Sequence, residues 1–134
     1  MTKKENNIKY FKDEVNRFID YFGLYDWRVY IEEQTDKDSL ASCHWHELRY
    51  RENDDHNGGG QTATIYYSKH WVENKKTTKE QLSRTAFHEV LEIMLCKLRD
   101  YAVNTKYLVT EMEIDNEIHR LIRIFENKLH GLIT

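Results

Sequence analysis

The segment from Thr85 to Leu95 places three groups capable of chemistry inside an apolar run. It reads TAFHEVLEIML, so His88, Glu89 and Glu92 lie among aliphatic and aromatic residues. A buried charge without a partner costs several kcal/mol, so packing alone does not explain two carboxylates and an imidazole in such a run. Side chains four residues apart on a helix point the same way and can bind one metal ion. His88 and Glu92 are therefore candidate metal ligands, with Glu89 placed as a candidate general base.

The helical positions of these groups favour a buried site over a solvated helix face. With His88 at zero and a rotation of about 100° per residue, Glu92, Cys96 and Glu89 fall at about 40°, 80° and 100°. Apolar side chains cover most of the remaining circle: Ala86, Phe87, Val90, Leu91, Ile93, Met94 and Leu95. The alternatives are a buried His–Glu pair that only fastens the core, or a helix end exposed at a subunit boundary. Such a pair needs one carboxylate, whereas metal-assisted hydrolysis uses one as a ligand and a second to accept a proton.

A third ligand is expected on the last helix, because a catalytic zinc site usually has three protein ligands and an open position. Asp115, His119 and Glu126 lie along one border of its apolar stripe, where they face a neighbouring helix. We select His119, since imidazole suits zinc and two His with one Glu is a known ligand set. Asp115 is the reserve ligand, and the alternative for His119 is a hydrogen bond to Glu126 or Asp115. The sequence therefore predicts one Zn²⁺ site.

The remaining histidines and cysteines are weaker candidates. His44 and His46 alternate on one strand face and could hold a metal together, with Cys43 pointing away from them. Cys43 and Cys96 are expected to be free thiols in a reducing compartment rather than a disulfide. Three further histidines are expected at the surface: His56, His70 and His130.

Length and charge limit the classes of protein that this chain can be. Its 134 residues predict a single domain, residues 1–134. A net charge of −3 provides no basic surface for nucleic acid, and nucleic-acid binding is not expected. The sequence has neither the pattern of a signal peptide nor an apolar stretch long enough for a membrane span, so a cytosolic location is expected.

The hydrophobic pattern predicts an α+β fold in the order α-β-β-β-α-α. The expected sheet is small and three-stranded, antiparallel in its simplest form or mixed, and three helices pack against it. Thr77 or Thr78 is expected to cap the middle helix, with Glu80 or Gln81 completing a capping box, and Gly23 should end the first helix. Helices are expected at 8–22, 77–98 and 111–129, strands at 27–33, 39–51 and 62–71, a hairpin loop at 52–61 and a looser stretch at 99–110.

Four segments carry a resemblance to a known family. They read FGLYDWRVYIEE, ATIYYSKHW, RTAFHEVLEIML and EIHRLIRIFENKL, and with the first helix they cover most of the chain. The chain resembles small zincin-like metallopeptidases encoded by phages and prophages, whose layout is related to that of SprT-like peptidases. Glu92 stands where the second histidine of the more familiar motif would be, which leaves the identity of the metal more open. The matching positions are His88, Glu89 and Glu92 in the first motif, and His119, Arg123, Glu126 and Asn127 in the second.

The resemblance implies a zincin fold and hydrolysis of peptide bonds in a protein or peptide substrate. It also implies that the strand at 62–69 lines the cleft and pairs with an extended peptide. Arg123 and Tyr107 are candidates for stabilising the oxyanion. The alternative is a protein of the same shape without catalysis, in which a metal or polar cluster is structural and an outer surface binds a host or phage protein.

Overall fold

The three strands and the three long helices follow one another in the predicted order, and a further short helix is added between the last strand and the second long helix. The computed structural model describes residues 2–35, 39–47, 61–104 and 110–133. The expected hairpin loop at 52–61 lies, apart from residue 61, outside the described residues. The elements are α1 Lys3–Tyr21, β1 Trp27–Gln34, β2 Ala41–Glu47, β3 Gln61–Ser68, α2 Lys69–Glu73, α3 Lys79–Asn104, α4 Glu111–Phe125, the π-helical turn η1 Glu126–His130 and α5 Gly131–Ile133.

The helix ends follow from local hydrogen bonding. The Thr2 side chain accepts from the Glu5 N–H, and the Glu5 side chain accepts from the Thr2 N–H, so α1 begins five residues before its predicted start. Gly23 follows α1 with φ +67°, a conformation that favours glycine. Thr78 and Gln81 form the corresponding reciprocal pair before α3, at 3.2 and 2.9 Å, which confirms Thr78 as the cap.

The end of one strand and the end of one helix also differ from the prediction. The strand expected to reach residue 71 ends at Ser68, and the short helix α2 follows it directly. The helix expected to end at residue 98 continues to Asn104, so part of the predicted looser stretch is helical. Among the described residues, no helix is both long enough and apolar enough to cross a membrane.

The sheet is mixed rather than fully antiparallel, and its order is β1-β3-β2. β1 pairs with β3 in parallel, with Val29 opposite Ala63, and β2 pairs with β3 in antiparallel, with Cys43 opposite Ile65. The prediction that 62–69 is an edge strand is therefore wrong, because β3 forms hydrogen bonds on both sides. Its sequence QTATIYYS contains no charged residue, whereas β1 and β2 carry charged or titratable residues, as edge strands commonly do.

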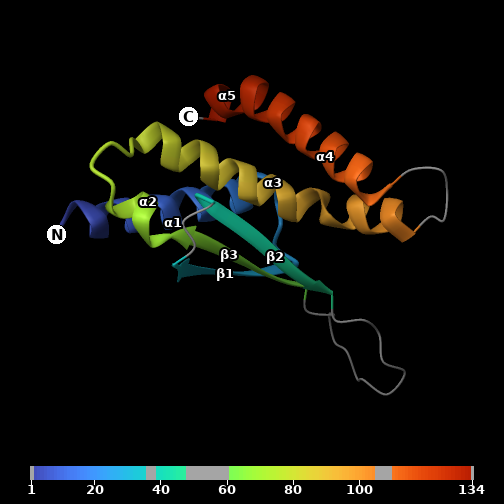
Figure 1. The fold of residues 1–134 in the computed structure, drawn as a ribbon, viewed down its shortest axis with the longest axis horizontal. Helices are drawn as coiled ribbons and strands as arrows, with labels where there is room; N and C mark the ends of the chain where they lie inside the picture. Colours follow the sequence, from blue (N-terminus) through green and yellow to red (C-terminus); the bar gives the residue numbers. More distant parts are fainter. Residues whose placement is uncertain (1, 36–38, 48–60, 105–109, 134) are drawn as a thin grey trace, which may run out of the picture.

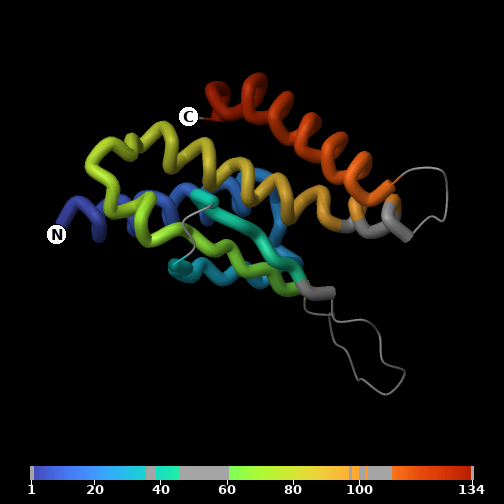
Figure 2. Tube along the Cα trace, viewed as in Figure 1, coloured from blue at the N-terminus to red at the C-terminus, as the bar shows by residue number. Residues whose placement is uncertain are grey.

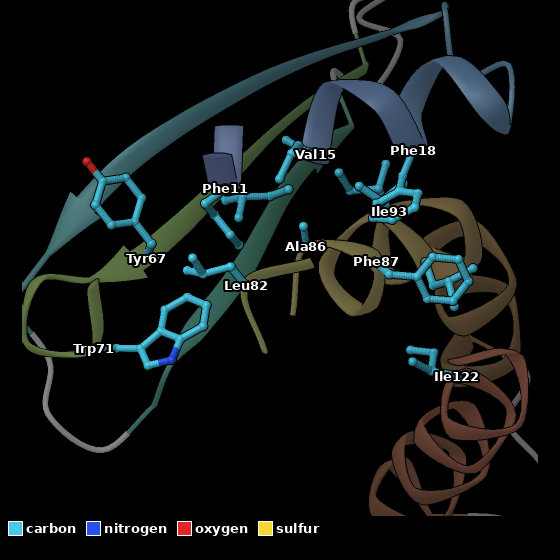
Figure 3. Close-up of a cluster of buried hydrophobic side chains, with 14 of the residues drawn as sticks. Phe11, Val15, Phe18, Tyr67, Trp71, Leu82, Ala86, Phe87, Ile93 and Ile122 are labelled. Atoms are coloured by element: carbon cyan, nitrogen blue, oxygen red, sulfur yellow. The ribbon is translucent and has the colours of Figure 1, made fainter. Parts of the chain in front are cut away.

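The core lies between the sheet and two helices packed side by side. The rings of Phe11 on α1 and Tyr67 on β3 meet edge to face at 6.0 Å, and those of Phe18 on α1 and Phe87 on α3 at 5.1 Å. Figure 3 shows these side chains converging, with Ile122 of α4 entering from the far side of α3. α3 therefore crosses the middle of the molecule, with α1 and the sheet on one side and α4 on the other (Figure 1).

The C-terminal helix is interrupted by a π-helical turn, which changes the direction in which the His130 side chain points. With regular helical rotation His130 would lie at about 120° from Ile118, outside the apolar stripe, and was expected at the surface. A π turn holds more residues than an α turn and rotates those that follow it. His130 is instead only 4% exposed, its ring packs against Phe18 and Phe87, and its Nε2 lies 2.7 Å from the Ser83 Oγ.

Burial of His130 predicts a loss of stability in acid. Desolvation, together with the positive charge of Arg84, lowers the pKa of His130 below its ordinary value. A lowered histidine pKa means that the fold favours the neutral ring, so this contribution is complete above about pH 6.5 and is lost as the pH falls through the folded-state pKa. The free energy of unfolding, measured with urea, should fall less between about pH 7 and 5 in His130→Gln than in the wild type.

The exposed His70 provides the control for this measurement. His70→Gln should leave the acid dependence as it is in the wild type. Identical acid slopes in the wild type and in both variants would contradict a neutral, buried His130.

Candidate metal centre

The three side chains predicted as metal ligands meet between α3 and α4. These helices run in opposite directions along each other (Figure 2), so residues in the middle of one face residues in the middle of the other. His88, Glu92 and His119 each offer one ligand atom, and these atoms all lie within 4.8 Å of one another. The long-range part of the prediction, the approach of His119 to the other two residues, agrees with this geometry.

The distances suit a tetrahedral zinc site. The Glu92 Oε1 lies 3.0 Å from the His119 Nε2 and 3.7 Å from the His88 Nε2. Ligand bonds of about 2.0–2.1 Å in a tetrahedron place ligand atoms about 3.3–3.4 Å apart, which lies between the two observed values. Two imidazole nitrogens and one carboxylate oxygen are also a ligand set that zinc uses. These three residues could therefore hold a metal ion.

Both imidazoles are oriented by a hydrogen bond on the opposite ring nitrogen. The His88 Nδ1 lies 2.6 Å from the Glu126 Oε1, and the His119 Nδ1 lies 2.9 Å from the main-chain oxygen of Asp115. In each case Nδ1–H is the donor, which leaves Nε2 to face Glu92. A histidine ligand commonly donates its other N–H to a carboxylate or a carbonyl, and that bond fixes the ring and its tautomer.

Glu89 is a second carboxylate beside the candidate ligands, and it is more deeply buried than they are. It is 4% exposed, and its Oε2 has no hydrogen-bond partner among the described residues. Burial and the nearby negative charge of Glu92 raise the pKa of Glu89 well above its usual range. A carboxyl group in this environment is suited to accept a proton, as the sequence predicted for Glu89.

The pKa shifts of the remaining titratable groups indicate that carboxylates dominate the charge of the centre. Burial alone would lower the pKa of His88, but hydrogen bonds to Glu126 and Glu92 and the charges of Glu89 and Glu92 raise it to about 10. Burial alone would raise the pKa of Glu92, but hydrogen bonds from His88 and Glu89 lower it. Several carboxylates thus share a half-buried space, and a bound cation would compensate their charge.

A cavity of about 400 Å³ connects this centre to strand β2. It is lined by the three candidate ligands and Glu89, by the β2 segment Ala41–Trp45, and by part of the α3–α4 interface. Cys43 and Cys96 both line it, and no disulfide joins them, as expected. Burial raises the pKa of the Cys43 thiol, and the charges of Glu89 and Glu92 add to this effect.

Several other sequence candidates do not join the cluster of the three candidate ligands. The carboxylate of Asp115, the reserve ligand, is 2.5 Å from the Nε of Arg99 rather than beside His88. Arg123 is exposed on α4, and Tyr107 lies outside the described residues. The ring of His44 packs edge to face on Tyr66 at 5.4 Å, which agrees with an outward-facing strand residue. The side chain of His46, like the whole of His56, lies outside the described residues.

Glu126 contacts a candidate metal ligand, but the sequence did not identify which one. The alternative considered for His119 paired it with Glu126 or Asp115, but the Glu126 side chain, 16% exposed, contacts His88. Its place on the border of the apolar stripe of the last helix predicted a contact with a neighbouring helix. The partner depends on how far α4 slides along α3, which residue spacing does not determine.

No protein family, curated protein or solved structure matches this chain.

Loss of the third ligand should remove the metal. We expect the wild type to bind one Zn²⁺ at neutral pH, measured by elemental analysis after dialysis and by competition with a chromogenic chelator. His119→Ala should lower the affinity for zinc by more than about a hundredfold. Removing only the hydrogen-bond partner behind a metal ligand already lowers affinity by up to about a hundredfold, and removing the ligand itself should lower it further. Asp115→Asn should retain the ion, because this carboxylate is bonded to Arg99. Zinc loss in Asp115→Asn alone would reverse the assignment.

Removing the charge from the outer partner of His88 should weaken metal binding without abolishing it. Glu126→Gln should reduce zinc affinity by about 10- to 100-fold, since the amide orients and polarises the imidazole less well. The matched control is Glu117→Gln, which alters an exposed carboxylate on the same helix that is bonded to Arg120 at 2.9 Å. An unchanged zinc affinity in Glu126→Gln, measured in the same competition assay, would show that Glu126 does not support the site.

Proposed function

We propose that this protein is a zinc-dependent peptidase of the zincin type, with His88, Glu92 and His119 holding the ion and Glu89 serving as the general base. The observation that carries the proposal is Glu89. A polar cluster that only joined two helices would need one carboxylate between the imidazoles, and Glu92 fills that place. Glu89 adds a second carboxylate, 4% exposed, whose Oε2 has no partner among the described residues and which lines the same cavity.

Each residue of the site has a separate role in the proposed hydrolysis. A bound Zn²⁺ would supply a Lewis acid that polarises the substrate carbonyl and acidifies water. Glu89 accepts the proton of the attacking water and returns it to the amine that leaves. Glu126 and the main-chain oxygen of Asp115 keep the two imidazoles in the tautomer that presents Nε2.

The open edge of β2 supports an extended peptide as substrate. The main-chain oxygen of Leu40 accepts from the N–H of Ser68 at 2.8 Å, and the antiparallel register then alternates along the strand. Ser42 and His44 therefore bond toward β3, whereas the main-chain groups of Ala41, Cys43 and Trp45 point to the other side. No described strand pairs with that side. An extended peptide can add there, beside the candidate metal centre, so β2 takes the role first expected of 62–69.

The rival function is a non-catalytic protein in which the same cluster only joins α3 to α4. The two differ in what metal removal does. A structural ion would be fully coordinated by protein, and its loss would lower the melting temperature sharply, whereas a catalytic centre keeps an open position. The cavity beside His88, Glu92 and His119 favours the catalytic function.

The base assignment is tested by a change of one atom. Glu89→Gln should bind zinc as the wild type does, yet lose at least about a hundredfold in the rate of cleavage of a denatured protein such as casein. Cleavage is followed by mass spectrometry of the products, and zinc content by elemental analysis. The control Glu113→Gln alters an exposed carboxylate on α4 and should keep full activity. Undiminished cleavage in Glu89→Gln would refute the base role, and a zinc-loaded wild type without cleavage would favour the structural alternative.

A further inference from the structure

The cavity beside the candidate metal centre has an apolar wall that the proposed chemistry does not use. This wall is formed by side chains from three elements, while the candidate ligands and Glu89 line the same space. The cavity has a volume of about 400 Å³, which is within the range of pockets that bind small ligands. The apolar residues are Cys43 and Trp45 of β2, Leu95 and Cys96 of α3, and Ile118 of α4.

We propose that this wall is a specificity pocket, which receives a bulky apolar side chain, preferably an aromatic one, from the peptide residue next to the bond that is cleaved. The inference rests on the proposed function and names the substrate class for that site. The cavity is shared by the wall and the candidate ligands, so a side chain beside the reacting carbonyl reaches the wall without a change in the fold.

The pleat of β2 directs substrate side chains to the wall. Cys43 and Trp45 lie opposite Ile65 and Ala63, whose side chains are fully buried under the helices. Successive residues of a strand alternate between the two faces of a sheet. A peptide added to the open edge of β2 continues the sheet, so every second side chain of the peptide points toward the helices and enters the cavity.

The charges around the pocket disfavour an acidic or basic side chain. Arg99 lines the cavity beside the wall, but it bonds to Asp115 at 2.5 Å and to Glu111 at 3.0 Å. The positive charge of Arg99 is thus already compensated by two carboxylates, and a substrate carboxylate would find no unpaired cation on the wall. A basic side chain would find Asp115 and Glu111 already bonded to Arg99, and its charge would be desolvated against apolar atoms.

The position of Arg99 over Trp45 explains the preference for a ring. The guanidinium lies 5.6 Å from the centroid of the Trp45 ring, and its ion pairs hold it there. A second hollow of about 270 Å³ shares Cys43, Trp45 and Arg99 with the main cavity and extends the room for a long side chain. Guanidinium and indole groups both stack on aromatic rings, so a planar side chain gains more here than a branched aliphatic one.

Four hydroxamic acids test the pocket by binding rather than by activity, because a hydroxamate anchors to zinc and its substituent reports on the wall. Acetohydroxamic acid is the baseline, and the hydrocinnamic, succinic and β-alanine compounds carry a phenyl, a carboxylate and an ammonium group. Calorimetry on the zinc-loaded wild type should show the hydrocinnamic compound binding about tenfold more tightly than the baseline, from burial of the phenyl ring. The two charged compounds should gain nothing over the baseline.

Two variants locate the preference. Trp45→Ala removes the stacking surface, and Leu95→Phe fills the pocket while preserving an apolar core. Each should abolish the phenyl preference and leave the affinity for acetohydroxamic acid unchanged, so a folding defect in one variant does not remove the test. The control Tyr30→Ala alters an exposed ring on β1, away from the cavity, and should keep the preference.

The outcomes separate this inference from the function on which it rests. Binding of all four compounds with equal affinity would overturn the specificity pocket and leave the zinc-anchored site standing. Failure of acetohydroxamic acid to bind the zinc-loaded protein would overturn the proposed function, and the pocket with it. Tighter binding of the succinic compound than of the hydrocinnamic one would show that the wall selects acidic side chains, contrary to this inference.

Discussion

The contact of one carboxylate with two imidazoles holds the functional region together. The Glu92 Oε1 on α3 lies 3.0 Å from the His119 Nε2 on α4 and 3.7 Å from the His88 Nε2 on its own helix. Charges in so restricted a space destabilise a fold unless each has a partner. Glu126 provides such a partner behind His88, and the main-chain oxygen of Asp115 provides one behind His119. The packing of α4 on α3 and the chemistry of the cavity depend on the same few atoms.

Two polar links of different kinds set the position of α4. Arg99 lies seven residues after Glu92 on α3, and Asp115 lies one helical turn before His119 on α4. Because the helices are antiparallel (Figure 1), the Arg99–Asp115 ion pair follows the Glu92–His119 contact along the same interface. Arg99 also covers the ring of Trp45, so the outer link ties α4 to the edge strand. An ion pair of this kind adds little stability by itself, but it fixes geometry.

The π-helical turn at the end of α4 serves the other side of the molecule. It begins at Glu126, which contacts His88, and ends at His130, which is buried against Phe18 and Phe87. A regular helix would have turned His130 away from the core. π turns occur often near functional sites because they redirect side chains without ending a helix. Here the turn lets one short segment contact the candidate metal centre at Glu126 and close the core at His130.

The sequence by itself determined the features that depend on neighbouring residues. Helical geometry places His88 and Glu92 on one face inside an apolar collar, and the alternation in β1 separates its two faces. The sequence also limits the cap of α3 to Thr77 or Thr78, with Glu80 or Gln81 as its reciprocal partner. These follow from fixed distances along a local backbone, and the choice of His119 followed from its place on the border of an amphipathic stripe. The structure agrees with each of these predictions.

Only the tertiary structure decided which distant groups meet. The central place of β3, the partner of Glu126 and the burial of His130 depend on strand order, on the slide of α4 along α3 and on the π turn. The spacing of residues within one helix or strand is set by a few backbone torsions. It is therefore the same whatever the strand order and wherever α4 lies along α3. Long-range contacts are set instead by how all apolar faces pack at once. The open edge of β2 and the apolar cavity beside it therefore came from the fold.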